Sequence, residues 1–119
     1  MRIKRAVHAK KKRRKFLKEA KGYRGAWSRR YKLAKQQYYR SGEYAYRGRK
    51  EKKRFMRRLW IIRINAFARQ NGLRYNEFMH GLKLAGIQIN RKMLADLAVN
   101  DPETMEKYVE IAKESLNRV

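Results

Sequence analysis

Apolar residues recur at helical spacing through the second half of the chain, and punctuating residues divide that half into four segments. The first segment ends at Asn71 and Gly72, where a left-handed cap is the expected terminator. Helix starts are predicted at Asn76, Asn90 and Asp101, because a short polar side chain there can accept a hydrogen bond from a backbone N–H of the first turn. The pattern predicts a bundle of about four helices.

The same spacing predicts which side chains face the core of that bundle. Apolar residues three, four and seven positions apart fall on one face of a helix. The predicted stripes contain Leu59, Ile62 and Ala66 with their neighbours Ile61, Ile64 and Phe67, then Phe78, Met79, Leu82, Ala85, Met93, Leu94, Leu97, Ala98, Met105, Tyr108, Val109, Ala112 and Leu116.

The first half has helix-forming residues, no proline and no alternation of apolar and polar positions. Its glycines predict a short helix over about residues 9–21, a turn at 22–25 and a long helix over about 27–70. Gly42 and Gly48 lie inside the long helix, where kinks are expected. The predicted fold class is all-α: a long basic helical N-terminal extension followed by a small C-terminal helical bundle.

Charge follows the same division. The chain has 34 Lys and Arg and 10 Asp and Glu, a net charge of +24. Residues 1–60 hold 25 of these cations and three acids, whereas residues 61–119 hold nine and seven. Only the second half is rich in aliphatic residues, so we predict a basic extension at residues 1–58 and a compact helical domain at residues 59–119. Repulsion among the cations predicts that the extension is largely disordered until an anionic partner binds.

Residues that could carry catalysis are few. The chain has no Cys, and its two histidines, His8 and His80, lie in different segments. The sequence contains no phosphate-binding glycine loop, no nucleophile elbow and no recognisable metal-ligand spacing. No apolar run approaches the roughly 18 residues that a membrane span needs. We therefore predict no enzymatic activity, no cofactor or metal, no small-molecule substrate and no membrane partner.

Cations and aromatic rings are interleaved in the first half of the chain. Lys and Arg neutralise phosphates and planar rings stack on exposed bases, so the combination favours folded RNA. One alternative is that Trp27, Tyr31 and Tyr38, which share a helical face, pack against protein or against each other. For the KKKRRK run at 10–15, nuclear import or nonspecific polyanion binding is the alternative.

The candidate RNA-binding residues of the extension are these cations and rings. They are Arg2, Lys4, Arg5, Lys10, Lys11, Lys12, Arg13, Arg14, Lys15, Tyr23, Arg24, Trp27, Arg29, Arg30, Tyr31, Lys32, Arg47, Arg49, Lys50, Lys53, Arg54, Arg57 and Arg58. In the second half, a rim of cations at helix ends and connectors could face RNA, although ordinary solvated charge explains each one equally well. That rim contains Arg69, Arg74, Lys83, Arg91 and Lys92.

Specific motifs occur in three stretches: KFLKEAKGYRGAWSRRYKLAKQQ (15–37), YAYRGRKEKKRFMRRLWIIRINAFARQNGLRYNEF (44–78) and HGLKLAGIQINRKMLADLA (80–98). Together they cover nearly the whole chain and resemble the bacterial large-subunit ribosomal protein L-twenty family. The resemblance implies a helical extension threaded into large-subunit ribosomal RNA and a compact helical domain that binds the same RNA. Its RNA-facing region corresponds to the surroundings of Asn71, Gly72, Arg74, Lys83, Arg91 and Lys92.

The resemblance further implies a role early in large-subunit assembly, with neighbouring ribosomal proteins, including L-twenty-one, as partners. It implies a cytoplasmic location within the large ribosomal subunit, a plastid source being less favoured, and in some bacteria repression of the protein's own message. Two departures from the family pattern are Gly48, which puts a local RNA contact or the straightness of the helix in question, and Asn90, which still suits a cap. The main alternative function is a general nucleic-acid packaging or annealing protein. A cationic membrane-surface peptide fused to a bundle is disfavoured, because no wide apolar face accompanies the N-terminal cations.

Overall fold

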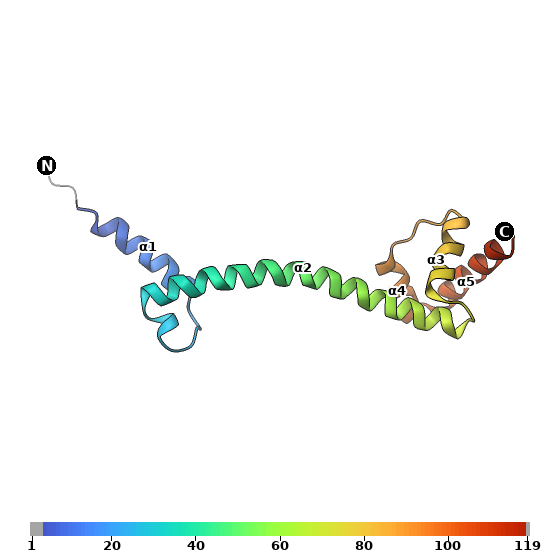
Figure 1. The fold of residues 1–119 in the computed structure, drawn as a ribbon, viewed down its shortest axis with the longest axis horizontal. Helices are drawn as coiled ribbons and strands as arrows, with labels where there is room; N and C mark the ends of the chain where they lie inside the picture. Colours follow the sequence, from blue (N-terminus) through green and yellow to red (C-terminus); the bar gives the residue numbers. More distant parts are fainter. Residues whose placement is uncertain (1–3, 119) are drawn as a thin grey trace. The chain divides into compact units, whose positions relative to one another are not determined.

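The computed structural model describes residues 4–118, and its regular secondary structure there is entirely helical (Figure 1). The elements are α1 (Ala6–Glu19), the 3-10 helix η1 (Gly25–Ser28), α2 (Tyr31–Gln70), α3 (Tyr75–Leu84), α4 (Arg91–Asn100) and α5 (Pro102–Asn117). The predicted all-α class is confirmed.

Contacts divide the chain into a first unit, Met1–Glu51, and a second unit, Lys52–Val119. Helix α2 belongs to both units. The domain boundary predicted from the sequence, between residues 58 and 59, is a statement about which part of the chain can fold by itself. It stays a prediction.

Helix α1 begins at Ala6, earlier than the expected residue 9, and ends at Glu19. The chain then turns at Gly22 and Gly25, whose φ angles of 90° and 62° lie in the left-handed region. Helix α2 begins later than predicted, at Tyr31, because η1 occupies the residues directly after the turn.

An aromatic cluster packs α1 against α2. The ring of Phe16 lies edge to face with three tyrosines, at centroid distances of 6.0 Å from Tyr31, 5.2 Å from Tyr38 and 5.9 Å from Tyr39. Such pairs contribute roughly 0.5–1.5 kcal/mol beyond their buried area. The first unit therefore has a small core of its own.

Two small side chains are buried in the same unit. Ala20, after α1, and Ala34, in the first turns of α2, have no exposed surface. The hydroxyl of Tyr23 donates a hydrogen bond to the hydroxyl of Ser41 at 2.8 Å. The turn between the helices is thus fastened to α2.

Helix α2 continues without interruption through Gly42 and Gly48, where the sequence led us to expect kinks. A Cβ atom at either glycine would meet nothing within 4 Å. Neither glycine is itself in a packed contact, and an isolated glycine lowers helix stability without breaking the hydrogen-bond pattern.

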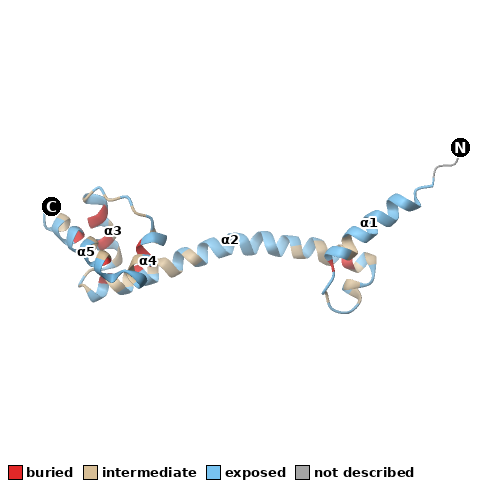
Figure 2. Cartoon of the chain, turned by 180° about the vertical axis from the view of Figure 1, so that it is seen from behind, coloured by how far each residue is buried: buried red, intermediate tan, exposed pale blue. Residues whose placement is uncertain are grey.

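The second unit has a buried core to which all four of its helices contribute (Figure 2). The buried residues are Ile64 and Ala68 from α2, Phe78 and Leu82 from α3, Leu94 and Ala95 from α4, and Met105, Val109 and Ala112 from α5. Most of them come from the predicted stripes.

Three predicted core positions are wrong. Ile62 and Met93 are 58% and 56% exposed, and Ala66 is exposed as well. Aliphatic residues occur on more than one face of α2, so the helical period alone does not select the buried face. The structure buries the face that carries Ile64 and Ala68.

The four predicted helix boundaries have mixed outcomes. Gly72, with φ of 82°, ends α2 as expected. The Asn90 side chain accepts a hydrogen bond from the Met93 N–H at 2.8 Å and caps α4. Asn76 is not a cap: α3 begins at Tyr75, and the Glu77 carboxylate reaches back to accept the Arg74 N–H at 2.8 Å.

Asp101 caps helix α5 as predicted, and Pro102 is the first residue of the helix. One carboxylate oxygen accepts the Thr104 hydroxyl at 2.5 Å, and the other accepts the Thr104 N–H at 3.2 Å. These hydrogen bonds, with a smaller contribution from the charge of Lys107, lower the pKa of Asp101 from its ordinary value of 3.8.

This lowered pKa predicts how acid acts on the fold. Because the pKa is lower in the folded state, ionised Asp101 stabilises the fold above the ordinary value, and that stability is lost as the pH falls toward the lower folded value. Between about pH 5 and pH 3, the thermal midpoint of the native chain should therefore fall more steeply than that of Asp101→Asn, which keeps a capping oxygen. Circular dichroism melts measure both curves, and parallel curves would contradict the assigned hydrogen bonds.

Helices α3 and α5 approach each other closely at Gly81. A Cβ atom on Gly81 would lie 2.7 Å from the carbonyl oxygen of Ala112 and 2.8 Å from its Cβ. The absence of a side chain at Gly81 therefore lets the two helices touch, which fixes how the second unit packs.

Candidate nucleic-acid interface

The cations of α1 and the residues before it form an exposed basic segment. Lys4, Arg5 and the six cations at 10–15 are all exposed, whereas Arg2 lies outside the described residues. Because consecutive residues of a helix point in different directions, the run at 10–15 surrounds α1 with positive charge. A helix charged on every side suits a site enclosed by phosphates.

Four predicted RNA-binding residues come together where α1 meets the start of α2. Arg13, Arg30, Tyr31 and Lys32 line an open hollow of about 550 Å³ with Leu33. The Arg13 guanidinium carbon lies 5.7 Å from the centre of the Tyr31 ring. This hollow offers three positive groups around one aromatic ring, an arrangement that can take a phosphate or a nucleotide.

The predicted aromatic contacts divide into two groups. Tyr31 and Tyr23 already have partners within the protein, namely Phe16 for the first and Ser41 for the second. The packing alternative is therefore what the structure shows for Tyr31. Trp27 differs, because its side chain is 47% exposed and can stack on a base.

The predicted cations from residue 24 to residue 58 are exposed. Those of the first unit are Arg24, Arg29, Arg30, Lys32, Arg47, Arg49 and Lys50. Those of the second unit are Lys53, Arg54, Arg57 and Arg58. At about 3.6 residues per turn, the cations of α2 from 47 to 58 surround most of the helix and leave free only the side on which Phe55 lies.

The turn after α2 holds two predicted residues in different ways. Asn71 is half-buried, and its side-chain amide donates to the carbonyl of Phe67 at 3.0 Å, so it fastens the end of the helix. Arg74 is exposed and lines an open hollow with Arg69 and Gly72. Arg74 is therefore the better placed of the two for an anionic partner.

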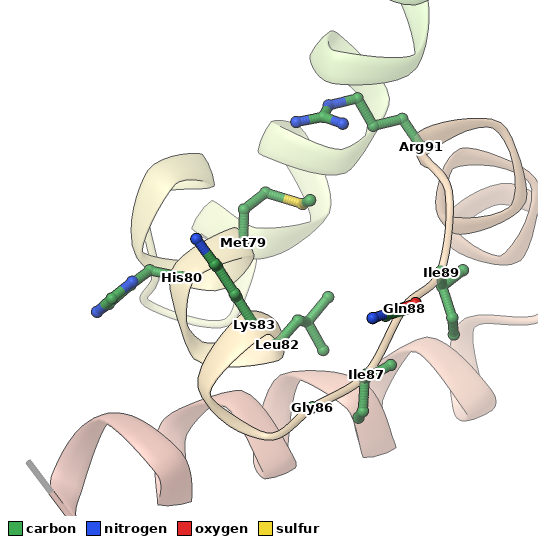
Figure 3. A pocket seen from close by; sticks show the side chains of 9 residues that line it. All are labelled: Met79, His80, Leu82, Lys83, Gly86, Ile87, Gln88, Ile89 and Arg91. Atoms are coloured by element: carbon green, nitrogen blue, oxygen red, sulfur yellow. The ribbon is translucent and has the colours of Figure 1, made fainter.

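Lys83 and Arg91 lie at one hollow of about 430 Å³ between α3 and the connector to α4 (Figure 3). Its apolar wall consists of Met79, Leu82, Ile87 and Ile89. The guanidinium of Arg91 donates to the Tyr75 hydroxyl at 2.7 Å, which fixes where its charge lies. Lys92 is exposed and does not line this hollow.

A family model described as Ribosomal protein L20 matches residues 2–108. The chain belongs to this family. It is 74% identical to the large ribosomal subunit protein bL20 of Thermotoga neapolitana, over 98% of each chain. It is 69% identical to the protein of the same name from Pseudothermotoga lettingae, over 99% of this chain and 97% of that one.

Membership of the ribosomal protein L20 family confirms three predictions: the resemblance itself, a structural role in the large ribosomal subunit, and a role that is not enzymatic. Among residues 4–118, no cluster of three or more His, Asp or Glu could hold a metal ion, and no described helix is long and apolar enough to span a membrane.

Three residues that organise this surface were not identified from the sequence of this L20-family chain. Phe16 positions Tyr31, Tyr75 positions Arg91, and Ser41 holds Tyr23. Each acts on a partner well separated along the chain, so no local motif marks it. Only the folded structure brings the pairs together.

Proposed function

We propose that this chain binds large-subunit ribosomal RNA through the cations of α1 and α2 and supports an early step of subunit assembly. One observation carries the proposal: every predicted cation from Lys4 to Arg58 is exposed. Each can reach a phosphate and release its condensed counterions, which allows RNA segments that repel each other to approach. Recognition then follows backbone and shape more than base sequence.

The second unit supplies a smaller contact region in this proposal. Arg74, Lys83, Arg91 and Lys92 lie at helix ends or connectors, and Tyr75 holds Arg91 in place. Residues 61–119 carry nine cations and seven acids, so their electrostatic attraction to RNA is small. This region therefore orients the protein on the RNA more than it adds to the affinity. We infer that residues 59–119 fold alone and hold the extension in position.

We further infer that a neighbouring ribosomal protein contacts the chain, with L-twenty-one the first candidate, and that it acts in the ribosome of a bacterial cytoplasm. Family membership and the bacterial relatives support this proposal.

Competition separates ribosomal RNA binding from general packaging of nucleic acid. The full chain, bound to a labelled large-subunit RNA fragment at moderate salt, is challenged with the same unlabelled RNA or with random duplex DNA. We expect the RNA to displace the label at much lower concentration than the DNA. Equal displacement would overturn the proposal in favour of packaging.

Neutralising two cations of α2 tests which charges act. If Lys50 and Lys53 each contact a phosphate, the double variant Lys50→Gln, Lys53→Gln should show a slope of log affinity against log salt that is about 1.6 shallower. At 0.1 M salt, its affinity for the RNA should be about 25- to 60-fold lower than that of the native chain. Glutamine keeps the helix propensity. The matched control is Lys107→Gln with Lys113→Gln on α5, which are also exposed. Equal losses in both pairs would contradict a localised interface.

A further inference from the structure

We propose that α2 carries a protein-docking surface, the stripe Phe55, Leu59, Ile62 and Ala66, that fits a ribosomal protein with an apolar face edged by acidic residues. The spacing of four, three and four residues places all four side chains on one helix face. Phe55 and Ile62 are 61% and 58% exposed, Ala66 is exposed and Leu59 is half-buried. The stripe lies within the second unit.

The stripe is separate from the face through which α2 packs on the core. The residues through which α2 packs on its own core are Trp60, Ile64, Phe67 and Ala68. At about 3.6 residues per turn these point to the opposite side of the helix. Helix α2 is thus apolar on two sides here, and the fold covers only one of them.

Charge along the edges of the stripe indicates what covers it. Lys52 and Arg63 follow one edge, and Arg58 and Arg69 follow the other. All four are exposed, and no Asp or Glu occurs between residues 52 and 70. A partner with carboxylates beside an apolar face would complement both the stripe and its edges.

A second copy of the chain fits poorly. The edges of the stripe carry the four cations and one acid, Glu51, so two stripes packed together would place positive charge mostly beside positive charge. RNA would match the cations but not the aliphatic side chains. Leu59 and Ile62 neither stack on bases nor form hydrogen bonds, and they gain stability by contact with other apolar groups. These features favour protein.

Photo-crosslinking in assembled subunits tests the proposal. The residue p-benzoylphenylalanine is placed at Phe55, at Ile62 or, as the control, at Lys53 on the other side of α2, and large subunits are isolated after irradiation. We expect the first two positions to join to one and the same ribosomal protein, at an apolar segment next to Asp or Glu. The control should give RNA adducts.

The identified protein is then titrated with the purified full chain. Ile62→Ser should weaken this binding by about tenfold to hundredfold. Val99→Ser, at a residue of α4 that is equally exposed, should leave it unchanged. Both variants should keep the melting temperature of the native chain, since both side chains lie at the surface.

The possible outcomes are distinct. RNA adducts, adducts with a second copy, or no protein adduct at Phe55 and Ile62 in assembled subunits would overturn this inference while leaving RNA binding intact. Equal binding by Ile62→Ser and the native chain would overturn it too. Absence of the chain from large subunits would overturn both this inference and the proposed function.

Discussion

Replacing Gly81 with alanine is expected to destabilise the second unit by about 1–3 kcal/mol, although alanine is the better helix former. The added Cβ would lie under 3 Å from the carbonyl oxygen, Cβ and Cα of Ala112. These are backbone or Cβ atoms of a packed helix, so rotating a side chain does not relieve the overlap. Helices α3 and α5 must separate, and the core contacts beside them weaken.

The same substitution at Gly48 is the matched control. Nothing lies within 4 Å of a Cβ built there, and the residue sits in an exposed part of α2. Gly48→Ala should therefore stabilise the helix by up to about 1 kcal/mol. Urea unfolding of the full chain, followed by circular dichroism, measures both variants. A Gly81→Ala chain as stable as Gly48→Ala would contradict the close approach of α3 to α5.

Helix starts could be predicted from the sequence where one side chain decides them. Asn90 and Asp101 accept N–H groups three residues ahead, as their residue types suggest. The start of α3 could not be predicted in this way. The carboxylate of Glu77 accepts a hydrogen bond from the N–H of Arg74, which makes a cap at Asn76 unnecessary. A cap by Asn76 and a cap by the Glu77 carboxylate were both compatible with the residue types, and the sequence did not show which of them forms.

The buried face of α2 could not be predicted from the sequence for another reason. Ile62 and Ile64 both fit a helical period, and which of them is buried depends on where α3, α4 and α5 pack. Gly81 also left no signal, because its neighbour Ala112 is remote in the chain. Tertiary contacts, rather than propensity, determine these positions.

The candidate site was predictable in its charges and less so in its geometry. Long cationic side chains are nearly always exposed, so listing them required little structural knowledge. The sequence did not place Arg13 beside Tyr31, nor Arg91 beside Tyr75, because each pair joins two separate elements. Family motifs identified the chain, whereas the hollows and the uncovered stripe of α2 required the fold.

Removal of residues 1–58 is expected to have the largest effect on RNA binding, since all 25 cations of residues 1–60 lie within them. The remaining domain keeps the rim cations Arg69, Arg74, Lys83, Arg91 and Lys92 as its candidate contacts. Even if all five touch phosphates, log affinity falls with log salt with a slope of only about 4 for this domain, whereas the many cations of the extension make the slope of the full chain much steeper. The truncated chain should still unfold cooperatively, because the whole core of the second unit lies after residue 58.

The salt dependence of binding to one large-subunit RNA fragment, compared between the full chain and residues 59–119, tests the central claim most directly. We predict a steep fall of log affinity with log salt for the full chain, and weak binding with a shallow slope for residues 59–119. Equal affinities and equal slopes would contradict the assignment of RNA binding to α1 and the exposed part of α2.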